Sequence, residues 1–222
     1  MTALPPNLSQ NTLGAYLKAL SEKTPTPGGG AAAALTLAQS CALFAMALRV
    51  SSNDLKNPLP PSPFLTEPVP ELAQVLAQFD SLQSRFLTLG DQDIEVFDAL
   101  MGAYRLPKET ATDKETRRHQ IQTQTALALN VPLQMAEAGL LTLRWAPLAV
   151  YLSKPSIISD CAIALELLVS GIHCCLVNAA INLKSLTDQD TREQTLKHMK
   201  QIEEDTLLRS SPMRDYCKKL LV

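Results

Sequence analysis

The chain has 222 residues, 46% hydrophobic and 19% charged, and its 20 Lys and Arg against 22 Asp and Glu give a formal net charge of −2. This balance provides no overall positive field that would gather nucleic acid or an anionic membrane, so we expect neither as a partner. The length suffices to bury a sizeable core, and we predict a single domain over residues 1–222.

Apolar residues recur at helical spacing along almost the whole chain, and alternating β-branched runs are absent, which predicts an all-α fold. Long amphipathic segments with few helix breakers indicate an up-and-down antiparallel bundle. Six helices are expected, over residues of about 11–22, 30–51, 70–104, 112–150, 156–186 and 190–220.

Several helix boundaries are suggested by single residues. A Pro-rich connection over 57–63 separates the second and third helices, and Gly90 is a candidate bend in the third. Thr112-Asp113 is the expected cap of the fourth helix, Ser156 or Ser159 that of the fifth, and kinks are expected at Pro132 and Pro147.

The N-terminus and the cysteines indicate the compartment. The chain does not open on a basic segment followed by an apolar one, and the apolar stretch 31–50 is Ala-rich and interrupted by polar residues, so neither a signal peptide nor a membrane span is expected. The five cysteines are odd in number and mostly lie in apolar helical pattern, which favours a reducing cytoplasm. No Cys/His spacing predicts a metal site.

The segment Pro27-Gly28-Gly29-Gly30 joins a loop directly to a helix of small residues. Glycine lets backbone N–H groups face a ligand closely, and the unpaired N–H groups of a first helical turn favour an anion. The simpler alternative is a Gly-rich connection into a buried Ala-rich helix. Neither nucleotide-binding glycine motif is present, so no nucleotide cofactor is expected. The small residues also predict close helix packing and a homodimer.

A second candidate site lies in the acidic segment 91–97. Acidic residues at this density normally form a solvated face. Asp93, however, shares its helical face with Phe97 and Leu100, whereas the other carboxylates point elsewhere. Burial of Asp93 would raise its pKa toward a value useful for acid/base chemistry, and Lys108 follows as a nearby cation.

The fifth helix carries a polar line. Asp160, Gly171, Asn178 and Asn182 fall within roughly 40° of one another, and the rise from Asp160 to Asn178 is about 27 Å. This length suits an elongated ligand or a groove shared by two subunits. The alternative is that the asparagines bond other helices or solvent, although apolar flanking residues indicate a buried helix whose amides need partners.

Five motifs together resemble a known family. The chain is similar, from about Leu13 to Asp188, to the cyclodeaminase domain of formiminotransferase-cyclodeaminase, a family that also includes bacterial methenyltetrahydrofolate cyclohydrolases. The motifs are Pro27-Gly28-Gly29-Gly30, Asp93-x-x-x-Phe97 leading to Leu106-Pro107-Lys108, Asn130-Val131-Pro132-Leu133, Ser159-Asp160, and Asn178 to Lys184.

The resemblance implies an all-helical dimer that acts on tetrahydrofolate one-carbon adducts without a metal or a nucleotide. Cyclodeaminases close 5-formimidoyltetrahydrofolate to 5,10-methenyltetrahydrofolate with loss of ammonia, and cyclohydrolases open the methenyl ring with water. Of the two activities, cyclodeamination is our first expectation and cyclohydrolysis our second, because the stretch Gly171 to Lys184 looks more like that of the cyclodeaminases. A third interpretation, from another class, is a folate-binding or structural helical dimer without turnover.

The same resemblance assigns roles to the candidate residues. Asp93 matches the proton-acceptor aspartate, and Asp160 would orient the pterin or the cationic carbon as a second catalytic residue. The side-chain amides of Asn178 and Asn182 would bind the pterin edge. A carboxylate of the glutamate tail would be held by backbone N–H groups and lysines, namely Gly28, Gly29, Gly30, Lys108 and Lys184.

The sequence departs from the family pattern in three places. Ala31 replaces a serine, Ser51-Ser52-Asn53-Asp54 replaces a basic stretch, and Ser153-Lys154-Pro155 replaces a Gly-Asn pair. Two of these three are expected where substrate is gripped, which bears on affinity for polyglutamylated folate and on activity.

Overall fold

The computed structural model describes residues 7–52 and 71–221, and the regular elements within these ranges are helices. Six α-helices are present there, with a short 3-10 helix before the fifth, so the expected all-α class is confirmed. Their bounds are α1 Leu13–Leu20, α2 Gly29–Ser51, α3 Leu72–Tyr104, α4 Ala111–Leu152, the 3-10 helix Pro155–Ile157, α5 Ile158–Leu183 and α6 Gln189–Leu221. The Pro-rich connection over 57–63 lies outside the described residues.

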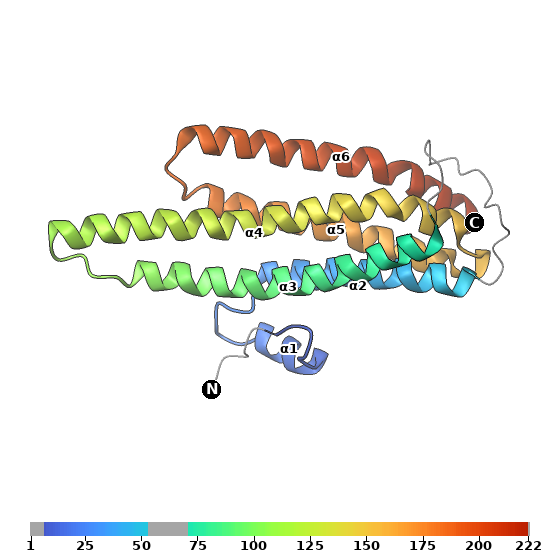
Figure 1. The fold of residues 1–222 in the computed structure, drawn as a ribbon, viewed down its shortest axis with the longest axis horizontal. Coiled ribbons are helices and arrows are strands. Elements are labelled where there is room, and N and C mark those ends of the chain that lie inside the picture. Colours follow the sequence, from blue (N-terminus) through green and yellow to red (C-terminus); the bar gives the residue numbers. More distant parts are fainter. Residues whose placement is uncertain (1–6, 53–70, 222) are drawn as a thin grey trace.

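Helices α2 to α5 form an up-and-down bundle in which neighbouring helices pack side by side and α2 also meets α4 across the middle. α2 contacts α3 and α5, and α4 contacts the same two helices, while α6 lies outside on α4 and α5 (Figure 1). The 42-residue α4 spans about 63 Å and extends, like α3, past the start of α2. The expected antiparallel bundle is confirmed, and the homodimer and the single domain stay predictions.

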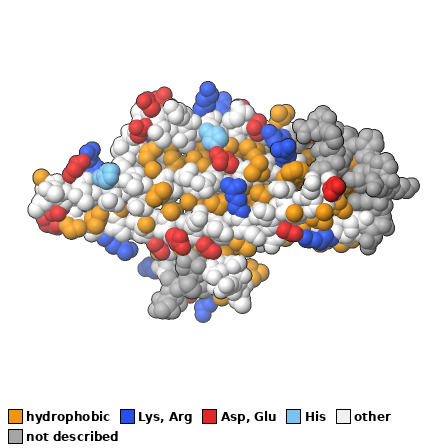
Figure 2. Space-filling view, viewed as in Figure 1, with side chains coloured by type: hydrophobic (Ala, Val, Ile, Leu, Met, Phe, Trp, Pro, Cys, Tyr) orange, Lys and Arg blue, Asp and Glu red, His pale blue; other side chains and the backbone are white. Residues whose placement is uncertain are grey.

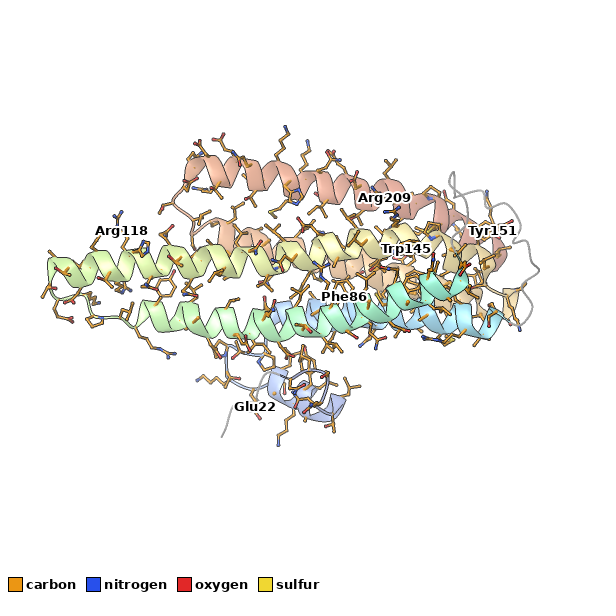
Figure 3. The ribbon with its side chains drawn as sticks, in the orientation of Figure 1. Glu22, Phe86, Arg118, Trp145, Tyr151 and Arg209 are labelled. Atoms are coloured by element: carbon orange, nitrogen blue, oxygen red, sulfur yellow. The ribbon has the colours of Figure 1, made fainter. Side chains whose placement is uncertain are left out.

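Aromatic and aliphatic side chains fill the middle of the bundle. The rings of Phe44 on α2 and Phe79 on α3 stack with centroids 5.5 Å apart. Phe86, which is fully buried, points from α3 into the same core (Figure 3). These contacts bring together helices that are each amphipathic, and they fix which face of α3 turns inward.

Small residues let the helices approach closely, as predicted for α2. A Cβ atom on Gly171 would lie 2.7 Å from the Leu37 side chain, and one on Gly90 would lie 2.9 Å from the Ala34 Cβ. The Ser40 hydroxyl donates to the Ala164 carbonyl at 2.7 Å across the same contact between α2 and α5. Gly90 therefore serves packing inside a continuous α3.

Two predicted helix caps are wrong. Thr110, not Thr112, caps α4: its hydroxyl accepts from the Asp113 N–H at 3.1 Å, and the Asp113 carboxylate accepts from the Thr110 N–H at 3.0 Å. Neither Ser156 nor Ser159 caps α5, because the 3-10 turn that starts at Pro155 leads directly into it. Proline's fixed φ suits a first helical position and starts this turn.

The segment before α2 is tied to α3 through two aspartates. The Leu8 N–H donates to Asp91 Oδ1 at 2.9 Å, and the Thr26 hydroxyl donates to Asp98 Oδ1 at 3.3 Å. Acidic side chains gather where the lobe that carries α1 meets the bundle (Figure 2). Tyr16 of α1 is buried in the same junction. These contacts fix the segment that precedes α2 against α3.

By length and composition alone, three helical stretches in the described residues could cross a membrane, namely Gly29–Ser51, Ala111–Leu152 and Pro155–Leu183. This differs from the sequence interpretation of 31–50. In the bundle, most of the apolar surface of α2 packs against its neighbours. The expectation of no membrane partner stays a prediction.

Candidate functional site

Three helices meet around the carboxylate of Asp93, near the start of α2. Asp93 on α3 lies against the backbone of Gly30, and a Cβ at position 30 would overlap its carboxylate carbon and both oxygens. From α5, the Asn178 Nδ2 donates to Asp93 Oδ1 at 3.0 Å. Asp93, the carboxylate that the sequence analysis selected, is therefore held by Gly30 and by the Asn178 amide, which come from distant parts of the chain.

Burial dominates the electrostatics of Asp93. It raises the pKa of this carboxyl to about 6, while the hydrogen bond from Asn178 acts in the opposite direction. A carboxyl with a pKa near neutrality is a base at pH 7 and returns a proton readily, which suits acid/base catalysis. Asp93 is partly buried, whereas Asp91 and Asp98 hold the N-terminal segment and Glu95 is exposed, so the predicted difference between Asp93 and the other carboxylates is found.

The first turn of α2 lies beside this carboxylate. Gly28 precedes the helix in an extended conformation without a side-chain cap, and the Ala32 N–H makes the first bond into the helix, to the Gly28 carbonyl at 3.1 Å. The N–H groups of Gly29 and Gly30 thus belong to the unpaired first turn. The chain's own Asp93 is the nearest anion, so a substrate carboxylate at Gly28–Gly30 would meet like charge.

Asn182 has a partner that the sequence analysis missed. Pro132 lies inside α4 and has no N–H, so the carbonyl of Ala128, four residues earlier, lacks its helical donor. The Asn182 Nδ2 donates to this carbonyl at 3.0 Å, and to the Asn178 carbonyl at 3.2 Å. The sequence did carry a signal for this bond, because a proline inside a helix leaves the carbonyl four residues earlier without its backbone donor.

The predicted polar line on α5 is divided by the structure. Asp160 lies in the first turn of α5, about 27 Å along the helix from Asn178, and Gly171 between them is buried against Leu37. Asp160 therefore does not lie beside Asp93 in one chain. The predicted role of Asp160, orienting the pterin or the cationic carbon, is not supported at Asp93 within one chain and stays a prediction.

The two candidate lysines differ in their distance from Asp93. Lys184 caps the end of α5, six residues or about 9 Å beyond Asn178, and its side chain is exposed. Lys108 is exposed in the loop after α3, whose last residue, Tyr104, is already about 17 Å along the helix from Asp93. Of the two lysines, Lys184 is therefore the nearer to Asp93 along the helices, without a contact to it in the described residues.

Two of the three departures from the family pattern lie far from Asp93. Ser51 at the end of α2 accepts a hydrogen bond from the Lys154 N–H at 3.0 Å. Ser51 is 21 residues from Gly30, or about 32 Å along α2. The third, Ala31, is buried in a cluster with Tyr16 and Ile94. The expectation that two departures lie where substrate is gripped is thus wrong for a site at Asp93 within one chain.

No group of three or more His, Cys, Asp or Glu side chains in residues 7–52 and 71–221 could hold a metal ion. All five cysteines are free thiols. The expected absence of a metal and of a cofactor stays a prediction.

Comparison with known proteins places these observations in a family. Residues 12–201 match the family described as formiminotransferase-cyclodeaminase. The chain is 31% identical over 188 residues to methenyltetrahydrofolate cyclohydrolase of Methylorubrum extorquens, covering 85% of this chain and 86% of that protein. It is 27% identical over 191 residues to formimidoyltransferase-cyclodeaminase of Rattus norvegicus, but spans only 34% of that protein's length. The crystal structure of formiminotetrahydrofolate cyclodeaminase from Thermotoga maritima has the same fold, with a TM-score of 0.73, 22% identity and 96% of each chain covered.

Gly30→Ala tests the close approach of α2 to Asp93. The added methyl group would displace the carboxylate, and we expect a loss of about 1 to 3 kcal/mol in the free energy of unfolding. Gly29→Ala is the matched control, because a Cβ there meets nothing within 4 Å, and it should leave stability unchanged or raise it by about 0.5 kcal/mol. Chemical denaturation measures both. Equal stabilities of the two variants would contradict the contact.

Asp93→Asn should stabilise the fold in a pH-dependent manner. The carboxyl ionises near pH 6 when folded, against about 4 when unfolded, so above about pH 6 the native state bears the full cost of a buried charge. Asparagine removes this cost, which amounts to at most about 3 kcal/mol. The stability difference should be largest at pH 8 and vanish as the pH falls from about 6 to 4. Denaturation curves of both proteins across this range measure it, and a constant difference would exclude a raised Asp93 pKa.

Proposed function

Because the chain belongs to the formiminotransferase-cyclodeaminase family, we propose that it hydrolyses 5,10-methenyltetrahydrofolate to 10-formyltetrahydrofolate, with Asp93 as the proton acceptor. The observation that carries this proposal is the partly buried Asp93 carboxylate, held by Gly30 and Asn178 with a pKa of about 6. It is a negative charge and a base in one group, and the methenyl carbon between N5 and N10 is a cationic electrophile.

The choice of hydrolysis over deamination rests on the relatives. The cyclohydrolase of Methylorubrum extorquens matches this chain over most of both lengths, whereas the cyclodeaminases of rat and mouse match it over about a third of theirs. Cyclodeamination of 5-formimidoyltetrahydrofolate is the second candidate, supported by those relatives. Both reactions pass through a tetrahedral carbon between N5 and N10, so the same carboxylate serves either.

Hydrolysis follows from proton movements at Asp93. The carboxylate removes a proton from water as the water oxygen bonds to the methenyl carbon, which forms a neutral tetrahedral adduct. Asp93 then returns this proton to N5 as the bond from carbon to N5 breaks. The hydroxyl of the adduct loses its proton to solvent and becomes the formyl carbonyl on N10. The anionic Asp93 also stabilises the positive charge of the bound substrate, because both are shielded from water.

Substrate contacts are proposed for the polar groups around Asp93. Asn178 and Asn182 use their amide nitrogens within the protein, so each would meet the N–H groups of a pterin edge through its side-chain oxygen. Lys184 would bind a carboxylate of the glutamate tail.

A homodimer is proposed as the working state. Ile163, Val177 and Ile181 lie along one outward row of α5 with 52%, 58% and 59% of their surface exposed. An apolar row of this kind is favoured at interfaces between subunits. Sedimentation of the purified chain should give twice the 24.2 kDa mass, and a monomer at micromolar concentration would contradict the proposal.

Absorbance of the methenyl chromophore tests the reaction. Purified protein receives 5,10-methenyltetrahydrofolate in one cuvette and 5-formimidoyltetrahydrofolate in another, beside blanks without protein. Faster loss of the chromophore in the first indicates a cyclohydrolase, and its appearance in the second a cyclodeaminase. Asp93→Asn should reduce the active rate by about 100-fold or more, the usual contribution of a positioned base.

The control variant is Glu95→Gln, which removes the same charge from an exposed position two residues along α3. It should retain the wild-type rate. Circular dichroism establishes that both variants are folded. If the folded wild-type protein changes neither substrate, the non-catalytic interpretation is favoured and the proposed reaction fails.

A further inference from the structure

We infer that Asn178 is a positioning residue for Asp93: its amide holds Oδ1 and leaves Oδ2 as the oxygen that exchanges a proton with substrate. This inference rests on the proposed function. The bond fixes the amide as well, because a carboxylate only accepts, so Asn178 must present Nδ2 and not its oxygen. The two side chains thus define each other's orientation.

Among the described groups packed around Asp93, Asn178 is the side chain that donates a hydrogen bond to the carboxylate. α2 from 29 to 40 and α4 from 121 to 136 carry no titratable side chain. From α5, the buried Cys175 thiol interacts electrostatically with Asp93; burial first, and then Cys174 and Asp93, raise its pKa, so it is neutral. From the α1 lobe, the pKa of Tyr16 is also raised by burial, and this phenol is neutral too.

Apart from the exposed Lys184 at the end of α5, the remaining charged groups nearby belong to α3 itself. Asp91 accepts from the Leu8 N–H, and Glu95 is exposed. No cation from these elements contacts Asp93 in the described part of the chain. The Asn178 amide is therefore the side-chain donor that favours the ionised carboxylate.

The turn that carries Asn178 is itself anchored to α4. Asn182, one turn later, donates to the backbone carbonyls of both Asn178 and Ala128. Because Pro132 leaves the Ala128 carbonyl without its helical donor, this tie satisfies a group that would otherwise be orphaned. The amide that orients Asp93 is thus set on a turn fixed to the neighbouring helix.

Asn178→Leu tests the inference, because leucine keeps the approximate size and removes the donor. A hydrogen bond to the anion lowers a carboxyl pKa, so its loss should raise that of Asp93. The base is needed deprotonated, and kcat/KM of the wild-type protein should fall as the pH drops through about 6. In the variant, this acidic limb should move to higher pH by about one to two units. Ser170→Ala, at an exposed position on α5, is the control and should not move it.

A second readout does not depend on turnover. In protein labelled with ¹³C at the aspartate carboxyls, the Asp93 resonance is assigned by its absence in Asp93→Asn and titrated without substrate. Asn178→Leu should shift this titration by the same amount as the acidic limb. Asn178→Ala, which also removes the donor, should give a shift in the same direction, and it replaces the leucine variant if that one does not fold.

The outcomes separate the two proposals. Matching shifts in the pH profile and in the carboxyl titration support the positioning role. A rate lowered equally at all pH values, with an unchanged titration, would overturn it and leave Asn178 a packing residue. If the wild-type protein turns over neither folate, the proposed function fails, whereas the carboxyl titration still decides whether Asn178 controls Asp93.

Discussion

The contact between the Asp93 carboxylate and the backbone of Gly30 is the constraint on which the rest of this arrangement depends. Removing a carboxylate from water is costly, and here two features offset part of the cost, namely the amide of Asn178 and the positive end of α2. The second acts only because α2 begins at this level of the bundle. The bonds of Asp91 to Leu8 and of Asp98 to Thr26 hold the preceding segment accordingly. The environment of the Asp93 carboxylate thus depends on the placement of four segments, namely α2, α3, α5 and the segment before α2.

The bundle keeps two groups of polar residues apart. Asp93, Asn178, Asn182 and Lys184 lie toward the start of α2 and the end of α5. Asp160 and the Ser51 to Lys154 contact lie at the opposite end of the same helices. Antiparallel helices produce this separation, because the beginning of one adjoins the end of the next. The chemistry near Asp93 is therefore independent, within one chain, of the substitutions at the far end.

Much of the fold follows from the sequence, because helical periodicity is a local property. The bounds of α2 and α3 and the burial of Asp93 could be read from the spacing of apolar residues. The cap of α4 could not, since Thr110 and Thr112 are equally suited by residue type and differ only in the turn that follows. The pairing of Asn182 with the Ala128 carbonyl depends on the register of α5 against α4, which only tertiary packing sets. The glycine pattern predicts a site for a foreign anion, whereas the anion beside Gly30 is the chain's own Asp93, which local sequence does not reveal.

The absence of a side chain at position 30 has a consequence for evolution. A mutation that places any Cβ there competes for the volume of the Asp93 carboxyl group, so the two positions cannot vary independently. A lineage that keeps the acid must keep the glycine, and a lineage that loses the glycine is released from keeping the acid. Among proteins of this fold, a residue other than glycine at position 30 is therefore expected together with a smaller or displaced side chain at position 93.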